Sequence, residues 1–198
     1  MQILYTVISA VIGYLLGSVN TSLVIGSILG VDIRKQGSGN AGATNAVRVL
    51  GKKAGILVFL GDFLKGVIAC FAGWLLFKNH IVSGIFAVIG HILPLYYGFK
   101  GGKGISTILG VLLFTDWRIF VIAGAWMLLM IYITKIVSVS TLSGLVVATI
   151  ISCFLHKGEY AIVSGILLLT VITFITHRQN IRRLLNGTEN KFGKKKDE

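Results

Sequence analysis

Seven apolar segments follow one another along the chain, with short gaps between most of them. They cover residues 3–29, 54–77, 81–98, 104–116, 118–134, 138–156 and 159–177. Hydrophobic residues make up 55% of the 198 residues, which is more apolar surface than a soluble domain of this size can bury. Because the apolar runs are continuous rather than alternating, they predict helices and not the strands of a barrel. We therefore expect an all-α polytopic membrane protein with seven transmembrane helices, forming one integral-membrane domain over residues 1–198.

Lys and Arg gather on one side of this predicted bundle. The gaps after the first, third and fifth segments, together with the basic tail at 178–198, hold 15 of the 19 Lys and Arg residues. By the positive-inside rule these gaps are cytoplasmic, so the N-terminus is periplasmic and the C-terminus cytoplasmic. Because the basic residues cluster in this way, we ascribe the net charge of +12 to membrane orientation and expect no nucleic-acid partner.

The fourth segment is short. Its apolar part, residues 105–115, makes about 16 Å of helix, whereas the hydrocarbon core of a bilayer is ~30 Å thick. It must nevertheless cross the membrane if the first basic gap and the basic tail are to lie on the same side. We expect the Gly-rich loop before it to dip inward, which is tolerated only where such a loop lines a cavity.

The first polar motif, GSGNAGATNAV, covers residues 37–47 and has basic residues on both sides. Its glycines permit positive φ, so a loop here can turn several backbone N–H groups toward one point. Hydroxyl and amide side chains add hydrogen bonds, and an arginine adds charge. We expect a phosphate cradle, with a flexible polar linker as the alternative. The candidate binding residues are Gly37, Ser38, Gly39, Asn40, Gly42, Thr44, Asn45 and Arg48.

The second motif, HILPLYYGFKGGKGIST, covers residues 91–107. Two lysines alternate with glycines just before a predicted helix start, where exposed N–H groups and the positive helix end favour an anion. It is not a Walker loop, because Tyr97 occupies the position that requires Gly. A flexible basic hairpin is the alternative. The candidates are Lys100, Gly102, Lys103, Gly104 and Thr107.

The third motif, HRQNIRRLLNGTEN, covers residues 177–190 and directly follows the last apolar segment. On a helix, His177 and Asn180 share one face, and Arg178 and Arg182 share another. Contact with anionic lipid headgroups would explain the arginines. Neither His177 nor Asn180 adds to such attraction at pH 7, so these two are candidates for the site.

Polar residues outside the three motifs are open to two interpretations. In KIVSVST, residues 135–141, Ser138 and Thr141 either contribute to the site or cap the next helix. Asp62 and Lys65 lie one helical turn apart within the second segment. They either form a structural ion pair or line the floor of the site.

All three motifs lie on the cytoplasmic side under the orientation that the Lys and Arg counts predict. Their shared preference for anions indicates one site for a phosphorylated ligand at the cytoplasmic membrane face. The chain has only seven Asp and Glu, and none pair on that face, so we expect no metal and no cofactor. Neither a nucleophilic cysteine nor a Ser-His-Asp set is visible.

Together, GSGNAGATN, GFKGGKGIST and HRQNIRRLLNGTE resemble the PlsY family of acyl-phosphate:glycerol-3-phosphate acyltransferases of the bacterial inner membrane. The resemblance extends over nearly the whole chain. It implies a multi-pass inner-membrane enzyme whose active site faces the cytoplasm. Such an enzyme transfers a fatty acyl group from acyl phosphate to the sn-1 hydroxyl of glycerol 3-phosphate, giving lysophosphatidic acid and phosphate, the first acylation of phospholipid biosynthesis. Neither acyl-CoA nor acyl carrier protein is the direct donor, and no metal is used.

On this resemblance, the catalytic residues are His177, Asn180, Lys103 and Ser38. His177 is a general base or, because acyl phosphate is already activated, only positions a substrate. Which cradle takes the donor phosphate stays open. We expect a monomer among membrane lipids, coupled functionally to the enzyme that forms acyl phosphate. A phosphate or lysolipid carrier and a headgroup transferase with a nucleotide-linked donor are the alternatives. The lack of internal repeats disfavours the first, and the shortage of carboxylates disfavours the second.

Overall fold

The computed structural model describes residues 1–191, and all regular secondary structure in that range is helical. It consists of two compact units, Met1–Thr115 and a second that begins at Asp116. The last part of the predicted basic tail, residues 192–198, lies outside the described residues. That residues 1–198 form one integral-membrane domain stays a prediction.

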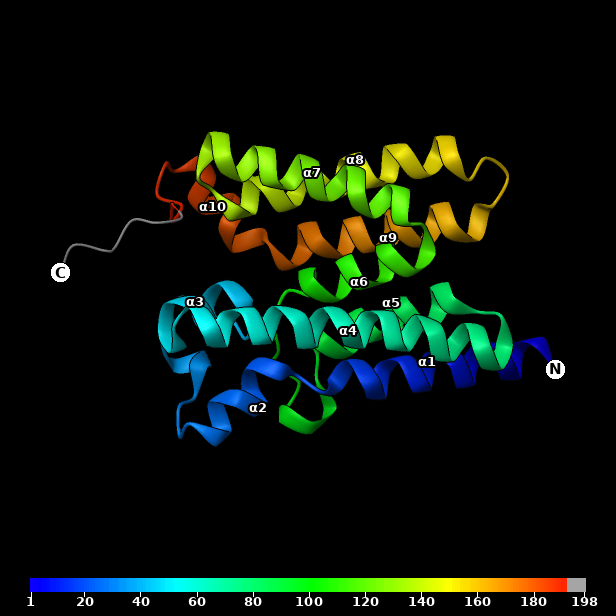
Figure 1. Ribbon diagram of the computed structural model, residues 1–198, viewed down its shortest axis with the longest axis horizontal. Coiled ribbons are helices and arrows are strands. Elements are labelled where there is room, and N and C mark those ends of the chain that lie inside the picture. The colour runs from blue at the N-terminus through cyan, green and yellow to red at the C-terminus, as the bar shows by residue number, and fades with distance from the viewer. Residues whose placement is uncertain (192–198) are drawn as a thin grey trace. The chain divides into compact units, whose positions relative to one another are not determined.

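The first unit contains six α-helices and two short 3-10 turns among its described residues (Figure 1). They are α1 (Gln2–Ser18), α2 (Thr21–Ile28), η1 (Ile33–Lys35), α3 (Ala43–Leu50), α4 (Lys52–Phe77), α5 (His80–Ile92), η2 (Leu95–Tyr97) and α6 (Ile105–Thr115). Within this unit α1 packs against α4 and α5, and α6 packs against the other side of the α4 and α5 pair. The short helix α3 lies along the first turns of α4.

The second unit contains four α-helices among its described residues: α7 (Trp117–Thr134), α8 (Val137–Leu155), α9 (Tyr160–Thr176) and α10 (Arg178–Leu185). The first three run side by side in the order α7, α8, α9 (Figure 1). The chain bends by 60° between α9 and α10, at His177. The third motif therefore begins at a helix break.

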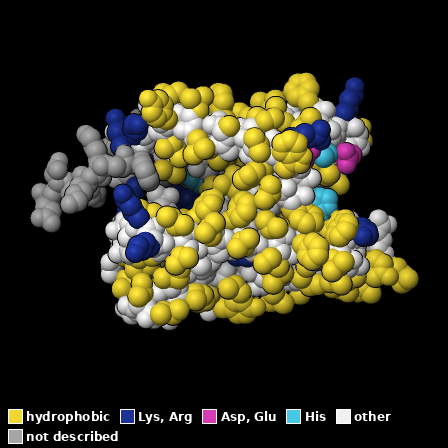
Figure 2. Space-filling model, in the orientation of Figure 1, with side chains coloured by type: hydrophobic (Ala, Val, Ile, Leu, Met, Phe, Trp, Pro, Cys, Tyr) yellow, Lys and Arg dark blue, Asp and Glu magenta, His cyan; other side chains and the backbone are white. Residues whose placement is uncertain are grey.

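Five helical spans are long and apolar enough to cross a membrane, and the bent pair α9 and α10 makes a sixth if it is counted as one span. The helix α6 is apolar but has only 11 residues. All seven predicted segments are thus helical, and the chain is a multi-pass membrane protein. That each segment crosses the bilayer stays a prediction. Figure 2 shows apolar side chains over most of the visible surface, with Lys and Arg near helix ends, as expected for helices that face lipid.

The uniform hydropathy of the first apolar segment predicted one continuous helix, but the structure shows two. Val19 and Asn20 are extended and separate α1 from α2. The Asn20 side chain caps α2, because its Oδ1 accepts a hydrogen bond from the Leu23 N–H at 3.2 Å. Asn followed by Thr and Ser is a typical helix start, and that local preference interrupts the apolar pattern here.

Small residues let the long helices of the first unit approach closely. A Cβ at Gly17 of α1 would lie 2.0 Å from the Ala87 carbonyl oxygen of α5. A Cβ at Gly110 of α6 would lie 2.1 Å from the Phe63 carbonyl oxygen of α4. Such contacts are typical of membrane helices, which associate by close packing rather than by the hydrophobic effect.

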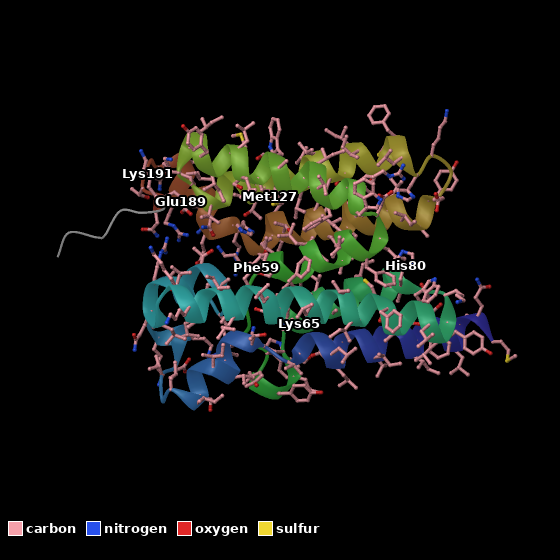
Figure 3. All side chains as sticks on the ribbon, viewed as in Figure 1. Phe59, Lys65, His80, Met127, Glu189 and Lys191 are labelled. Atoms are coloured by element: carbon pink, nitrogen blue, oxygen red, sulfur yellow. The ribbon has the colours of Figure 1, made fainter. Side chains whose placement is uncertain are left out.

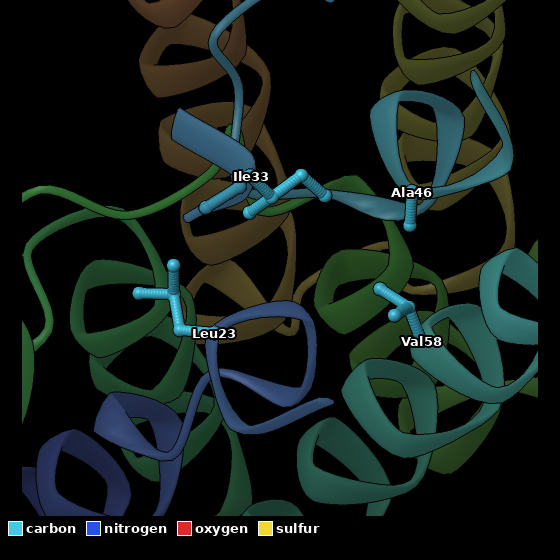
Figure 4. Close-up of a cluster of buried hydrophobic side chains, with 5 residues drawn as sticks. Leu23, Ile33, Ala46 and Val58 are labelled. Atoms are coloured by element: carbon cyan, nitrogen blue, oxygen red, sulfur yellow. The ribbon is translucent and has the colours of Figure 1, made fainter. Parts of the chain in front are cut away.

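A buried apolar cluster holds the first motif against the helices of its unit (Figure 4). Its members come from α2, η1, the loop before α3, α3 itself and α4, and are Leu23, Ile33, Ala41, Ala46 and Val58. Burying a side chain such as Ile33 or Val58 contributes about 1.5–3 kcal/mol relative to leaving it exposed. The first motif is therefore anchored on both sides of its polar stretch and is not a flexible linker.

Candidate active site

The first motif folds as a tight turn followed by a helix. The structure shows α3 beginning at Ala43, so Thr44 and Arg48 lie on a helix and not in the loop that the composition predicted. These two residues are four apart and share one face of α3. The helix forms because apolar residues recur at helical spacing from Ala43 to Leu50, after a break at Gly42.

The Asn45 side chain holds this turn together. Its Oδ1 accepts a hydrogen bond from the Ser38 N–H at 2.8 Å, and its Nδ2 donates to the carbonyls of Ile33 and Gln36 at 3.0 and 3.1 Å. Both amide hydrogens are thus used within the protein. Asn45 builds the loop, and the direct ligand contact predicted for it stays untested.

Backbone geometry explains two of the glycines in this motif. Gly37 and Gly39 have φ values of +60° and +72°, as predicted, whereas Gly42 is extended and precedes α3. The N–H groups of Gly39 and Gly42 donate to the carbonyls of Gln36 and Asn40. Together with the Ser38 N–H, three of the N–H groups that were expected to face a ligand are therefore used inside the turn. The groups that can still meet a ligand include side chains, such as those of Ser38 and Asn40, and the first backbone N–H groups of α3.

The second motif folds back along the end of α5. The N–H groups of Gly101 and Gly102 donate to the carbonyls of Ile92 and His91, both at 3.1 Å. Gly104 has φ +84° and leads directly into α6. Within α6, Thr107 is buried, and its hydroxyl has no hydrogen-bond partner among the described residues. Lys100, at the start of the loop, is exposed.

The first two motifs meet at Gly102. A Cβ at this position would lie 2.5 Å from the Ala41 carbonyl oxygen and 2.3 Å from His91 Nε2. No side chain larger than hydrogen fits there without movement. The first unit thus brings together two of the three motifs, as their shared anion preference predicted. Lys103, which follows Gly102, is half-buried beside this contact.

The third motif begins at the bend between α9 and α10. His177 is buried, and its Nδ1 lies 2.9 Å from the Thr173 carbonyl oxygen. A carbonyl only accepts hydrogen bonds, so Nδ1 carries the hydrogen and the lone pair of the neutral ring is on Nε2. The fold therefore selects the tautomer whose Nε2 can accept a proton or a hydrogen bond.

Glu189, which sequence reasoning missed, contacts two of the predicted site residues. Its Oε1 accepts hydrogen bonds from Ser138 Oγ at 3.0 Å and from Asn180 Nδ2 at 2.5 Å. Its Oε2 pairs with Arg183 Nε at 2.6 Å. Burial alone would raise the pKa of this carboxyl, but the hydrogen bonds from these three residues lower it below its usual range. The available signal was that Glu189 is the only acidic residue of the third motif.

Several other predicted residues have defined places in the second unit. Ser138 does not cap α8, whose N-cap is Ile136 without a side-chain hydrogen bond; it donates to Glu189 instead. The Thr141 hydroxyl donates to the Val137 carbonyl of its own helix. Arg178 and Arg182 are exposed on α10. The structure thus joins Ser138 and Asn180 of the candidate set, through a carboxylate outside it.

The buried charges of the second segment form an ion pair, as one of their two interpretations predicted. Lys65 Nζ lies 2.9 Å from Asp62 Oδ1, and the two side chains are 9% and 1% exposed. His91, the first residue of the second motif, lies 2.9 Å from Lys65 through its Nδ1. The ion pair is therefore in direct contact with a motif residue.

Comparisons with known proteins agree on one family. The family model described as glycerol-3-phosphate acyltransferase matches residues 7–187. The glycerol-3-phosphate acyltransferase of Clostridioides difficile (strain 630) is 44% identical over 100% of both chains. That of Bacillus subtilis (strain 168) is 42% identical over 91% of this chain and 94% of its own.

Solved structures of an integral membrane glycerol 3-phosphate acyltransferase, PlsY, have a similar fold. Its glycerol 3-phosphate form matches with a TM-score of 0.90 and 35% identity, over 95% of this chain and 96% of that chain. Its lysophosphatidic acid form matches with a TM-score of 0.87 and 34% identity, over 95% of each chain.

Proposed function

The chain belongs to the glycerol-3-phosphate acyltransferase family, and on that premise we propose its reaction in full. It transfers a fatty acyl group from acyl phosphate to the sn-1 hydroxyl of glycerol 3-phosphate, giving lysophosphatidic acid and inorganic phosphate. The family match over residues 7–187 carries this conclusion, because it covers the first two motifs completely and residues 177–187 of the third. The contact of two of these motifs at Gly102 supports it.

Acyl phosphate as the donor fits the chemistry of the candidate residues. Both substrates would carry a phosphate, and the motifs supply Arg48, Lys100 and Lys103 together with hydroxyl and amide donors. Backbone and side-chain donors of this kind stabilise negative charge that develops on phosphate and carbonyl oxygens. Gly37, Gly39, Gly42 and Gly104 allow the backbone to approach such a ligand closely.

In the proposed reaction the sn-1 hydroxyl attacks the carbonyl carbon of acyl phosphate. The new ester bond forms, the bond from the carbonyl carbon to the phosphate oxygen breaks, and phosphate leaves. The hydroxyl proton goes to His177 Nε2, the nitrogen that bears the lone pair because Thr173 holds Nδ1–H, or to a phosphate oxygen. Asn180 orients the glycerol end, and Lys103 and Ser38 stabilise the developing negative charge.

We further propose the topology and setting of the enzyme. All seven segments cross the bacterial inner membrane, with the N-terminus periplasmic and the three motifs facing the cytoplasm. The protein acts as a monomer and is coupled to the enzyme that forms acyl phosphate. Adding a label-accessible cysteine near Lys52 should give modification only from the cytoplasmic side, and modification only from outside would reverse the topology.

The reaction is tested by measuring phosphate release from palmitoyl phosphate by the purified protein. We expect release that requires glycerol 3-phosphate and continues with chelator present and without CoA. Omitting either substrate provides the control. If glycerol 3-phosphate binds but no phosphate is released, the carrier alternative replaces this proposal.

The role of His177 is tested separately with His177→Ala. A general base contributes roughly 10²–10⁴-fold to a rate, so a variant that keeps more than about a tenth of the wild-type rate excludes that role. A His177→Gln variant is the matched comparison, because glutamine restores a hydrogen-bonding group without a comparable base. Recovery in His177→Gln alone would assign His177 to positioning.

A further inference from the structure

The break between α1 and α2 exposes backbone groups in the interior of the first unit. Val19 and Asn20 are extended, so the helical hydrogen-bond pattern stops at Ser18 and restarts at Thr21. Lys65 Nζ, labelled on α4 in Figure 3, donates to the Val19 carbonyl at 2.8 Å. Asp62 Oδ1 accepts from the Thr21 N–H at 3.3 Å and from its hydroxyl at 3.1 Å. The ion pair therefore supplies hydrogen-bond partners at the end of α1 and at the start of α2.

Each charge lies at the helix end that favours it. The Lys65 ammonium group, from α4, lies next to the C-terminal end of α1, where carbonyl groups create partial negative charge. The Asp62 carboxylate, also from α4, lies next to the N-terminal end of α2, where N–H groups create partial positive charge. Both side chains are buried, so water competes little with these contacts. The pair thus fixes where α1 ends and where α2 begins.

Lys65 also sets the tautomer of His91. An ammonium group has three hydrogens, and Nζ has three acceptors: the Val19 carbonyl, Asp62 Oδ1 and His91 Nδ1 at 2.9 Å. His91 Nδ1 must therefore accept, which places the ring hydrogen on Nε2. Nε2 is the atom against which Gly102 packs. The ion pair thereby orients the ring that the second motif contacts.

The same network reaches the first motif by a second route. Asn20, the residue between the broken helix ends, donates through Nδ2 to the Ala41 carbonyl at 3.3 Å. That carbonyl is the group that a Cβ at Gly102 would approach within 2.5 Å. One route runs through His91 to Gly102, the other runs through Asn20 to Ala41, and the two meet where the motifs touch.

Two features of this network limit what it contributes to the free energy of unfolding. Asp62 Oδ2 is buried and has no hydrogen-bond partner among the described residues. Leaving a buried acceptor unsatisfied is costly, and a buried ion pair often stabilises a fold no better than apolar residues of similar volume. An interior charge pair within a membrane span is, by default, a reason to look for a functional role.

We propose that Lys65, together with Asp62 and His91, is a positioning residue for acyl transfer. It fixes the helix break and the His91 ring, and through them the contact between Ala41 and Gly102 that sets the spacing of the first two motifs. The inference rests on the proposed function, because that function makes these motifs the phosphate cradle. Lys65 itself contacts no substrate in this proposal.

Two variants test it. Lys65→Met removes the ammonium group and keeps an unbranched side chain that is one heavy atom shorter. His91→Asn keeps an acceptor for Lys65, because asparagine Oδ1 takes the place of Nδ1, but it removes the ring edge beside Gly102. For both we expect the KM for at least one phosphate substrate to rise about tenfold, with kcat changed less than about threefold, which corresponds to misplacing about one charge-assisted hydrogen bond to a phosphate. Lys65→Arg, which keeps the charge, should recover part of the loss.

Hydrogen exchange provides a readout that does not depend on activity. We expect faster amide exchange in both variants over residues 37–42 and 98–104, and unchanged exchange in α8. The matched control is Asp116→Asn, which disrupts an ion pair in the second unit and should change neither KM nor exchange in the two loops. If wild-type protein fails to use acyl phosphate, the proposed function falls, while the exchange comparison still decides the positioning role.

Unchanged KM values with unchanged loop exchange would overturn the proposal. So would a fall in activity that only follows the amount of folded protein. If neither variant accumulates as folded protein, the network is required for folding and the positioning role is likewise rejected.

Discussion

Two clusters of the same composition occur in the two units of this protein. In the first unit Asp62 is beside Lys65 and His91. In the second, Asp116 Oδ2 lies 2.6 Å from Arg118 Nη2 and 3.1 Å from His156 Nε2. Each cluster thus has one aspartate, one cation and one histidine. They differ in exposure, because the Lys65 side chain is 9% exposed and that of Arg118 is 49% exposed.

Their surroundings give the two clusters different roles. Asp116 caps α7 by accepting from the Arg118 N–H at 2.8 Å, and His156 extends the cluster to Glu159 before α9. These contacts join helix ends where water can replace a lost partner. The first cluster satisfies a helix break in the interior, where water is scarce. The same three residue types therefore tie down loops at one place and determine the path of a membrane span at the other.

The largest difference is expected from removing each aspartate. Asp62→Ala leaves Lys65 buried and unpaired, which costs about 3–5 kcal/mol of the free energy of unfolding. Asp116→Ala should cost less than half as much, since Arg118 turns to water. Denaturant unfolding of both variants in the same detergent measures the two losses. Equal losses would show that burial does not distinguish the clusters.

Glu189 is a third case, a carboxylate whose side chain is 6% exposed and which has three partners. Glu189→Ala removes the acceptor that orients Asn180 and Ser138, so we expect kcat/KM to fall roughly 10–100-fold, as for loss of a hydrogen bond to a charged group. Arg183→Lys is the control, because it keeps the charge next to Glu189. Activity and thermal unfolding are measured together. A loss of stability with unchanged kcat/KM in the folded fraction would contradict the orienting role.

The contact between His91 and Gly102 within the second motif gives a further difference between the units. Gly102→Ala places a Cβ 2.3 Å from His91 Nε2, so we expect about a tenfold rise in the KM of a phosphate substrate as the loop shifts, of the order expected for overpacking. Gly124→Ala is the matched control in α7, where a Cβ would have no neighbour within 4 Å. Steady-state kinetics of both variants measure this difference in KM. Equal kinetics would mean that the loop adjusts without cost.

The smallest effect is the part of the pH dependence of stability that arises from Asp116. Hydrogen bonding from Arg118 lowers the pKa of Asp116 from 3.8 to about 2. The folded state then binds fewer protons than the unfolded state in acid. The stability from Asp116 is full above about pH 4 and is lost as the pH falls toward 2. Thermal unfolding between pH 6 and 3 should show a smaller slope in Asp116→Asn, and identical slopes would contradict this assignment.

Hydropathy predicted most helical segments closely; α7, for example, was expected over 118–134 and covers Trp117–Thr134. The third segment was expected over 81–98, whereas α5 ends at Ile92. Hydropathy did not predict the break at Val19 and Asn20, because apolar residues continue on both sides. The partner that satisfies this break, Lys65, is 46 positions away in the sequence. A local pattern carries no information about such a partner.

Within the candidate site, the positive φ of Gly37 and Gly39 followed from composition, since glycine tolerates this region best. The helix at Ala43 did not, because the small polar residues there are typical of loops as well. Asn45 was predicted to face a ligand; the structure shows that it holds the turn, and the ligand contact stays a prediction. Composition indicates which side chains can form hydrogen bonds, but not whether their partners are substrate or protein.

The sequence by itself determined that the chain is a multi-pass membrane protein with three polar motifs of one acyltransferase family, for which it predicts anion binding. These properties depend on hydropathy, on counts of Lys and Arg and on short ordered motifs, which are all local. Only the tertiary structure decided that Glu189 orients Ser138, that Gly102 meets Ala41 and that Lys65 completes a broken helix. Each of these contacts joins positions from 46 to 61 residues apart, and a buried polar group takes whichever partner the packing of the helices brings to it.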